Sequence, residues 1–136
     1  MAYTYDFERP SVTGDTILLK GGKVLLIKRL REPFKDMWAL PGGFLNMDET
    51  TEECAARELF EETKMVANNL KFFTIADKVD RDPRGRIISV VYSGFADPKA
   101  EPVASDDAKE VSFFNLNDLP DLAFDHADIL NSLINR

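Results

Sequence analysis

The sequence predicts an α/β (α+β) fold in which two helices cover a mixed β-sheet. Apolar, β-branched runs of strand length recur along the chain, and two segments with helical apolar spacing interrupt them. The resulting order is β-rich, helix, β-rich, helix, which favours a layered sandwich. With 136 residues, 44% of them hydrophobic, the chain has the length and apolar content of one globular domain. We therefore expect a single domain over residues 1–136.

The first two strands form a predicted hairpin. The runs SVTGDTILLK (11–20) and KVLLIKRL (23–30) are separated by Gly21 and Gly22, which suit a tight turn. The segment REPFKDMWALPGGF (31–44) follows, with two prolines and two glycines. We expect it to be a loop with a short extended piece at Trp38–Leu40.

The rest of the chain supplies two helices and three more strands. Thr50 or Thr51 is placed to cap a helix that runs to about Thr63, with Glu53 completing a capping box. Strands are predicted at 70–79 and 86–96, joined by a type I turn at Asp82–Gly85, and at 110–116. A last helix is predicted over 122–136. Its apolar stripe is Leu122, Phe124, Ala127, Leu130, Leu133 and Ile134.

Composition narrows the classes of partner and compartment. The formal net charge of −7 argues against an unaided nucleic-acid surface, which is normally basic. Cys54 is the only cysteine, so no intrachain disulfide can form and a reducing compartment is the default. No apolar run reaches the roughly 18 residues of a membrane span, and the first ten residues lack a signal-peptide core. We expect a cytoplasmic protein without nucleic-acid or membrane partners.

The predicted first helix carries three carboxylates on one side. At about 100° per residue, Glu58, Glu61 and Glu62 fall within an arc of about 100°. A solvated face is the commoner explanation for an acidic helix, yet like charges at i,i+4 repel unless a cation lies between them. Hard divalent cations prefer oxygen ligands, so carboxylates without histidine favour Mg²⁺ or Mn²⁺. The adjoining arc is the predicted core face, formed by Ala55, Ala56, Leu59 and Phe60.

The segment LPGGF before this helix strengthens the cation hypothesis. Gly42 and Gly43 allow the backbone to approach a ligand closely and to present a carbonyl to a metal. A glycine loop followed by a capped helix with clustered carboxylates is the arrangement expected of a cation-binding site.

These residues resemble the Nudix box of the Nudix hydrolases. Gly43, five residues, Glu49, seven residues and then RELFEE (57–62) match a long pattern, which makes chance agreement improbable. Lys64 departs from the pattern, because the family has glycine there. That glycine resembles a helix C-terminal residue of positive φ, a conformation that costs a lysine about 1 kcal/mol.

The resemblance implies an α/β/α sandwich and hydrolysis of a diphosphate linked to another moiety. Carried over by position, it implies that the metal ligands are Gly42, through its carbonyl, with Glu58, Glu61 and Glu62. Arg57 resembles the residue that pairs with Glu49 to orient loop and helix, and we count Glu58, Glu61 and Arg57 as the predicted catalytic residues. Many members use a further acidic residue outside the box, for which the candidates are Asp106, Asp107 and Glu110.

Four flanking segments also resemble ADP-ribose pyrophosphatases: ERPSVTGD, KRLREPFKDMWALPGGF, RDPRGRIISVVY and LAFDHADIL. Guanidinium groups suit phosphate and ribose oxygens, so the predicted substrate-binding residues are Arg29, Arg81, Arg84 and Arg86. A solvated turn, neutralised by Asp80 and Asp82, is the alternative explanation for the last three.

The sequence therefore predicts a Mg²⁺-dependent hydrolase, with Mn²⁺ as a second possible cofactor. The expected substrate is a nucleoside diphosphate derivative, ADP-ribose, cleaved to AMP and ribose 5-phosphate, and the resemblance suggests a homodimer. The alternatives are a hydrolase of modified nucleoside triphosphates and a non-catalytic Nudix-like ligand-binding module. The presence of all the box glutamates favours an enzyme over the binding module.

Overall fold

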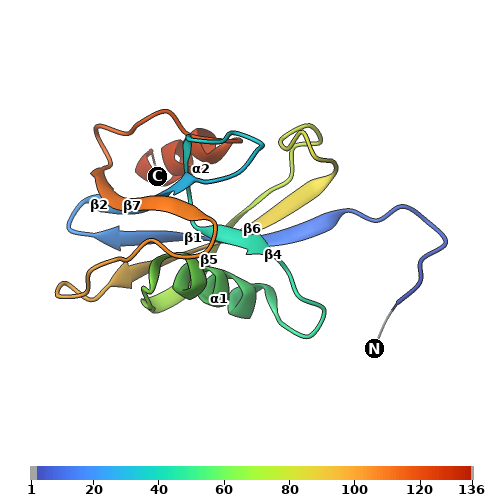
Figure 1. The fold of residues 1–136 in the computed structure, drawn as a ribbon, viewed down its shortest axis with the longest axis horizontal. Coiled ribbons are helices and arrows are strands. Elements are labelled where there is room, and N and C mark those ends of the chain that lie inside the picture. The colour runs from blue at the N-terminus through green and yellow to red at the C-terminus, as the bar shows by residue number, and fades with distance from the viewer. Residues whose placement is uncertain (1–2, 136) are drawn as a thin grey trace.

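The computed structural model describes residues 3–135 and shows a curved sheet with one helix on each face (Figure 1). The strands and helices are β1 (Ser11–Lys20), β2 (Lys23–Arg29), β3 (Trp38–Ala39), β4 (Gly42–Phe44), α1 (Thr51–Thr63), β5 (Ala67–Ala76), β6 (Ile87–Ala96), β7 (Ala108–Asn115) and α2 (His126–Ile134). The predicted sandwich of helix, sheet and helix is confirmed.

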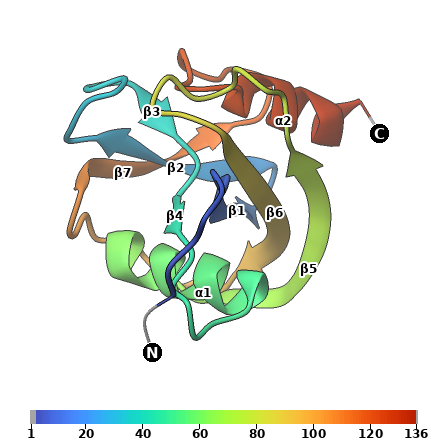
Figure 2. The ribbon, with the colours of Figure 1, turned by 90° about the vertical axis from the view of Figure 1, so that its right-hand side faces the viewer.

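The sheet is mixed, as predicted. Its strand order is β3-β2-β1-β6-β5, with β4 paired to β1 and β7 paired to β2. The β1–β6 pair is parallel and the other pairs are antiparallel. Figure 2 shows how the sheet curves around its axis, so that β4 and the start of β1 lie close to α1. This curvature opens one end of the sheet to solvent, and the candidate site lies there.

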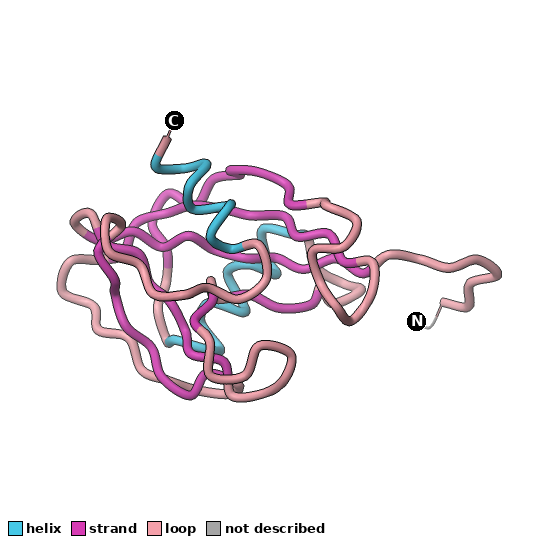
Figure 3. The backbone as a smooth tube through the Cα atoms, turned by 90° about the horizontal axis from the view of Figure 1, so that it is seen from above, coloured by secondary structure: helices cyan, strands magenta, loops and turns pink. Residues whose placement is uncertain are grey.

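Each helix closes a separate part of the core. On the α2 side, Ile17, Val91 and Leu130 pack together and are essentially inaccessible to water. On the α1 side, Leu18, Leu59 and Met65 do the same. Figure 3, seen from above, shows both helices lying across the strands. Burial of these side chains contributes roughly 1.5–3 kcal/mol each, which fixes the sheet between the two helices.

Element boundaries follow the sequence prediction to within two residues, apart from three larger differences. The hairpin of β1 and β2, the Thr50 capping box and the turn closed by the Gly85 N–H on the Asp82 carbonyl are confirmed. However, 42–44 forms a strand in place of the predicted loop, because β1 pairs with it. Strand β5 occupies 67–76, not 70–79, because its partner in β6 reaches Ala96.

The second helix begins at His126, four residues later than predicted. Phe124 has a φ of +54°, which no right-handed α-helical residue adopts, so a helix that starts at 122 cannot run through this residue. The predicted end at Arg136 lies outside the described residues. Within residues 3–135, no helix is long and apolar enough to cross a membrane.

The buried face of α1 differs from the predicted one. Cys54, Ala55, Leu59, Glu62 and Thr63 are buried, whereas Ala56 and Phe60 are exposed. The cause is Gly14 in β1. A Cβ there would lie 2.8 Å from the Ala55 nitrogen and 3.0 Å from the Cys54 sulfur, so the helix packs directly on this glycine. This contact turns the carboxylate side of α1 towards the sheet.

Candidate active site

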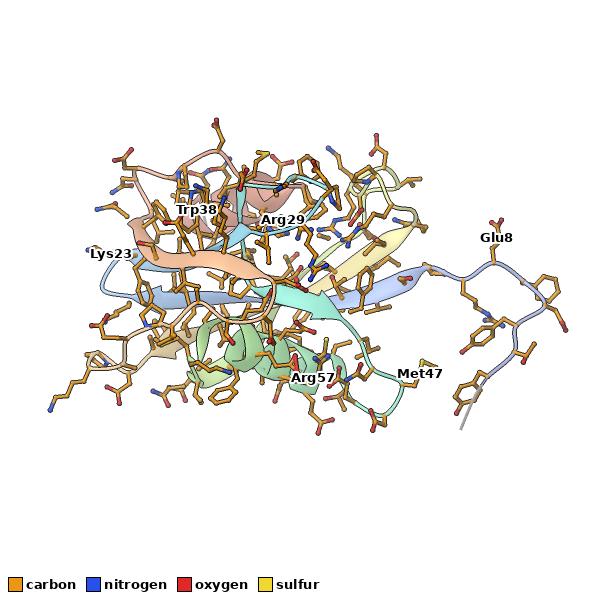
Figure 4. The ribbon with its side chains drawn as sticks, in the orientation of Figure 1. Glu8, Lys23, Arg29, Trp38, Met47 and Arg57 are labelled. Carbon is orange, nitrogen blue, oxygen red and sulfur yellow. The ribbon has the colours of Figure 1, made fainter. Side chains whose placement is uncertain are left out.

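A cleft of about 410 Å³ opens at the end of the sheet where β1, β4 and α1 meet. Its lining includes the carboxylates of Asp15, Glu58 and Glu62, and it also includes the guanidinium groups of Arg29, Arg81 and Arg84. In Figure 4, Arg29 and Arg57 lie on opposite sides of the strands at this end. The tertiary structure thus brings the predicted acidic helix and three of the four predicted substrate-binding arginines into one cavity.

Glu62 is the most deeply buried carboxylate of the cluster. Only 6% of the residue is exposed, and its Oε1 accepts a hydrogen bond of 2.8 Å from the Gly42 N–H. Burial raises the pKa of Glu62 well above its usual range, and the nearby charges of Glu58 and Asp15 raise it further. A buried carboxylate with one neutral donor and acidic neighbours has a strong physical preference for a cation.

Glu58 lies beside Glu62 on the same side of α1. The absence of a side chain at Gly43 makes room for it, because a Cβ there would lie 2.4 Å from the Glu58 carboxyl carbon. Burial raises the pKa of Glu58, although Arg57 opposes the shift. Glycine at position 43 is therefore required by close packing against a carboxylate.

Arg57 organises the acidic cluster. Its Nε and Nη2 donate to the two carboxylate oxygens of Glu49 at 2.9 and 2.7 Å, and its Nη1 donates to Glu58 at 2.8 Å and to Glu61 at 3.0 Å. Nη2 also donates to the Phe44 carbonyl at 3.1 Å. The hydrogen bonds from Arg57 hold the pKa of Glu49 down at about 2. One guanidinium thus ties the 45–50 loop to α1 and fixes the orientation of Glu58.

Glu61 differs from its two neighbours. Its side chain is 43% exposed, pairs with Arg57 and is not among the residues that line the cleft. Helical geometry explains the difference, because Glu61 projects from the solvent side of the arc. Any metal contact by Glu61 would therefore come from the outer rim of the cluster.

Asp15 is a cleft residue that the sequence did not reveal. It lies on β1, is 6% exposed, and accepts a short hydrogen bond from the Ser89 hydroxyl. Burial raises its pKa to about 6. A Cβ on Gly42 would lie 1.7 Å from Asp15 Oδ1, so Gly42 must be glycine for the carboxylate to approach the loop. The sequence signal was a single Asp inside an apolar strand. The sequence pattern alone does not distinguish such a buried cleft residue from an exposed residue at the edge of a sheet.

The four predicted substrate-binding arginines have different surroundings. Arg81 is 9% exposed and makes a bidentate ion pair with Asp125 at 3.0 and 2.7 Å, so its guanidinium is committed to the fold. Arg84 pairs with Asp82 in the same way, at 3.1 and 2.8 Å, and lies over the rings of Phe44 and Phe124. Arg86 donates to the carbonyls of Asp77 and Lys78 and does not line the cleft.

Of the four predicted substrate-binding arginines, Arg29 has the most donor capacity to spare in the cleft. Its Nε donates to the Pro33 carbonyl at 2.7 Å, and its guanidinium lies 5.0 Å from the centre of the Phe124 ring. Within residues 3–135 its terminal nitrogens have no hydrogen-bond acceptor. Burial and the positive charge of Arg84 lower the pKa of Arg29, although the carboxylates of Glu62, Asp82 and Asp107 oppose the shift.

Among the acidic candidates outside the box, Asp107 alone lines the cleft, where it pairs with Arg31 at 3.0 Å. Asp106 is exposed with a φ of +54°, and Glu110 pairs with Lys28 at 3.2 Å on β2. Glu110 is kept out of the cleft by the register of β7 against β2, which places it opposite Lys28.

The donor set fits a hard divalent cation. Across residues 3–135, no three Asp, Glu, His or Cys side chains form a complete set of metal ligands by themselves. Mg²⁺ commonly takes only one or two carboxylates and completes its octahedron with waters and substrate phosphates. Glu62, which is buried, and Glu58, which is partly buried, both lie beside a glycine loop and line the cleft, so they match that requirement.

Comparison with known proteins identifies the family. The model of the NUDIX domain matches residues 9–133. The chain belongs to the NUDIX family. It is 48% identical over 122 residues to an ADP-ribose pyrophosphatase from Methanocaldococcus jannaschii, an alignment that covers 89% of this chain and 71% of the relative. The chain is thus a Nudix pyrophosphohydrolase closely related to an ADP-ribose pyrophosphatase.

Other Nudix relatives include regulators and bifunctional enzymes. The ADPR responsive transcriptional repressor NtrR of Acinetobacter baylyi is 32% identical, with 96% of this chain covering 56% of it. The NUDIX domain of Shewanella oneidensis NrtR, complexed with ADP ribose, superposes with a TM-score of 0.87 at 30% identity, covering 97% of this chain and 93% of that one. A bifunctional NMN adenylyltransferase/ADP ribose pyrophosphatase from Francisella tularensis, complexed with AMP and Mn ion, superposes with a TM-score of 0.82 at 33% identity, covering 96% and 43%.

The Nudix pattern also explains the strained end of α1. Lys64 has a φ of +62° and caps the helix through a hydrogen bond from its N–H to the Phe60 carbonyl. The conformation is the one expected for the glycine of the family pattern. The helix exit is therefore preserved despite the lysine, whose Nζ lies 5.2 Å from the Phe60 ring centre.

Proposed function

We propose that this Nudix domain hydrolyses ADP-ribose to AMP and ribose 5-phosphate in a Mg²⁺-dependent reaction. The observation that carries the proposal is that one cleft is lined by the buried carboxylate of Glu62, the partly buried carboxylate of Glu58 and the guanidinium of Arg29, which has uncommitted donors. A pyrophosphate diester is an anion that needs cations around it, and this cleft offers a place for a metal as well as the guanidinium of Arg29. The relatedness to an ADP-ribose pyrophosphatase supports the choice of substrate.

In this proposal the metal is held by Glu58, Glu62 and the Gly42 carbonyl, with Glu61 contributing from the rim. Bound there, Mg²⁺ or Mn²⁺ would neutralise phosphate charge and lower the pKa of an attacking water. Arg57 keeps Glu58 in place through its hydrogen bonds. Arg29 binds a phosphate or ribose oxygen, and Asp107, the one of the three predicted acidic candidates that lines the cleft, is available to the water. The water passes a proton to Asp107 and forms a bond to one phosphorus as the bridging P–O bond breaks, which releases AMP and ribose 5-phosphate.

The proposal also covers the location of the protein and its macromolecular partners. We propose a cytoplasmic location, since the chain has one cysteine, and no nucleic-acid partner, since the net charge is −7. We also propose a homodimer.

A panel assay tests the function. Purified protein with Mg²⁺ should release AMP from ADP-ribose, and Glu62→Gln should lose most of that rate while remaining folded. Pyrophosphate release from modified nucleoside triphosphates, with ADP-ribose left intact, would select the triphosphate hydrolase instead. Tight ADP-ribose binding without metal-stimulated turnover would select the binding module. Full turnover by Glu62→Gln would refute the assignment of the metal site.

A further inference from the structure

His126 is a buried polar side chain of the cleft that uses only one of its two ring nitrogens within the fold. The residue is 4% exposed and lines the cleft. Its Nδ1 accepts a hydrogen bond of 3.0 Å from the Leu40 N–H. A neutral imidazole that accepts at one nitrogen carries its proton on the other, so Nε2 is a donor. Among the residues that the structure describes, 3–135, this Nε2–H has no hydrogen-bond acceptor.

The Nε2–H of His126 remains accessible from the cleft. In the described part of the chain, no side-chain nitrogen or oxygen is both sealed from water and without a hydrogen-bond partner. Since Nε2 has no partner there, it keeps contact with solvent, and the cleft that His126 lines provides that contact. Donors on deeply buried side chains nearly always meet an acceptor. A molecule bound in the cleft is able to supply one.

The imidazole of His126 is neutral at neutral pH. Burial and the positive charge of Arg81 lower the pKa of His126 to about 3, although the carboxylate of Asp125 opposes the shift. The hydrogen bond from Leu40 needs the same neutral form, because a protonated imidazole has no acceptor nitrogen. The ring therefore presents one uncharged N–H donor to the cleft.

The surrounding segments fix the direction of this donor. Trp38 and Leu122 form a parallel bridge, and the Ala123 N–H donates to the Trp38 carbonyl at 2.8 Å, so the residues before α2 lie against β3. Figure 4 shows Trp38 on the side of the strands where α2 lies. The hydrogen bond from Leu40 then orients the ring of His126 itself. A donor held in this way loses little freedom when a ligand binds to it.

The donor lies in the same cleft as the carboxylates of the proposed metal site. Leu40, which His126 binds, is two residues before Gly42, whose N–H donates to Glu62 at 2.8 Å. Two residues of chain span at most about 7 Å, so His126 and Glu62 bind neighbouring points of one loop. A substrate whose pyrophosphate lies beside Glu62 therefore brings the groups attached to that pyrophosphate towards Nε2.

Uncommitted donors gather around the Phe124 ring. The centre of this ring lies 5.4 Å from that of His126 and 5.0 Å from the guanidinium of Arg29. The carboxylate next in sequence to His126 does not compete for Nε2, because Asp125 accepts two hydrogen bonds from Arg81. Donors of this kind suit an oxygen-rich ligand, and a nucleoside diphosphate derivative carries phosphate and ribose oxygens in both of its halves.

We propose that His126 is a substrate-binding residue, whose Nε2–H donates a hydrogen bond to an oxygen of the bound nucleoside diphosphate derivative. This inference rests on the proposed function, because that function supplies the substrate. One ring then has two tasks, since Nδ1 orders the loop that carries Gly42 and Nε2 contacts the ligand. Substitution can separate the two tasks, because asparagine and glutamine place their amide groups at different distances from the backbone.

His126→Asn and His126→Gln each keep one of the two ring functions. Asparagine retains an acceptor oxygen near the position of Nδ1 and has no atom at that of Nε2, whereas glutamine brings an amide donor to the position of Nε2 and leaves the Leu40 N–H without its acceptor. His126→Asn should raise the KM for ADP-ribose about tenfold with kcat within about threefold of the wild type, as loss of a binding contact does. His126→Gln should keep KM within about threefold and unfold at a lower urea concentration than His126→Asn.

Binding of the two products shows which half of the substrate the donor meets. Isothermal titration calorimetry in Mg²⁺ measures AMP and ribose 5-phosphate separately. His126→Asn should weaken the binding of one product about tenfold and leave the other within about twofold of the wild type. Asp128→Asn is the control, because Asp128 is exposed in the same first turn of α2 and does not line the cleft, and it should change neither affinity.

Two results would overturn the inference while leaving the proposed function in place, provided that the wild type hydrolyses ADP-ribose. One is a His126→Asn variant with the KM and product affinities of the wild type. The other is equal weakening of both products, which indicates a distorted cleft. A wild type that binds ADP-ribose without hydrolysing it would refute the proposed function alone, since a weaker complex with His126→Asn would still support the contact. A wild type that neither binds nor hydrolyses ADP-ribose would overturn both.

Discussion

Replacing Glu62 by glutamine should stabilise the metal-free protein, although it should inactivate the enzyme. Glu62 is 6% exposed, accepts one hydrogen bond from the Gly42 N–H, and faces the charges of Glu58 and Asp15. Glutamine keeps the shape and the acceptor oxygen while removing the charge. The folded state then loses a repulsion that the unfolded chain, solvated by water, does not have.

The structure sets the size of the gain. An inadequately paired buried polar group costs about 1–3 kcal/mol, and the like-charge contact at i,i+4 adds about 0.2–0.5 kcal/mol. At about 2.1 cal/mol/K per residue, the 136 residues give an unfolding entropy near 0.29 kcal/mol/K, so 1 kcal/mol corresponds to about 3.5 °C. We expect Glu62→Gln to raise the melting temperature in EDTA by about 4–12 °C.

The gain should depend on pH with a definite sign. Because burial raises the pKa of Glu62 in the folded state, the folded protein binds the proton more tightly than the unfolded chain does. The wild type therefore loses this contribution as pH rises above the ordinary carboxyl range. The stability difference between variant and wild type should be small near pH 4.5 and larger at pH 8.

Bound metal should make the wild type more stable than Glu62→Gln. With saturating Mg²⁺ and AMP, the wild type should gain stability by mass action, about 2.7 kcal/mol at a ligand concentration of one hundred times Kd, while the variant gains much less. Differential scanning fluorimetry in EDTA and in Mg²⁺ with AMP measures both effects. Glu52→Gln is the control, because it removes the same charge from an exposed position in the first turn of α1. A helix N-terminus favours negative charge, so Glu52→Gln should be neutral or slightly destabilising.

Two results would refute this reasoning. One is a Glu62→Gln variant that is less stable than the wild type in EDTA at pH 8, since the carboxylate would then be stabilising without a cation. The other is equal stabilisation of both proteins by Mg²⁺ and AMP, since the cation would then bind elsewhere.

Three further predictions concern the cap, the buried histidine and the arginine of the acidic cluster. Lys64 has positive φ, so Lys64→Gly should be about 1 kcal/mol more stable than Lys64→Ala in urea unfolding, and equal stabilities would contradict a strained cap. His126 is 4% exposed, its Nδ1 accepts from the Leu40 N–H at 3.0 Å, and burial lowers its pKa to about 3. The folded pKa lies below the unfolded value of 6.5, so this contribution to stability is complete above pH 6.5 and declines as pH falls towards 3. In paired acid titrations, His126→Gln should lose less stability than the wild type over that window, and parallel curves would exclude the buried neutral imidazole. Arg57→Lys should lower stability by about 1–3 kcal/mol and the turnover number more than tenfold, because lysine cannot bridge three carboxylates. Arg86→Lys, which leaves the cleft untouched, should change neither by much, and equal effects of the two variants would contradict the role given to Arg57.

Local patterns in the sequence were enough for most of the helices and strands and for the identity of the acidic helix. Helical geometry alone places Glu58, Glu61 and Glu62 on one side of α1, and the Thr50 capping box fixes where the helix begins. The positive φ at Lys64 was likewise expected from the residue that the family pattern has there. These features depend on neighbours a few residues apart, so the sequence by itself determined them.

Contacts between distant segments decided the rest. Gly14 in β1 turned α1 so that Glu62 became buried and Phe60 exposed, and the pairing of β1 with β4 brought Asp15 against Gly42. The same packing separated the arginines, giving Arg81 to a buried ion pair and leaving Arg29 with free donors at the cleft. Contacts of a few ångströms between distant segments decide which charged side chain is buried and which partner it meets. The spacing of residues along the chain does not specify those contacts, so only the tertiary structure could decide them.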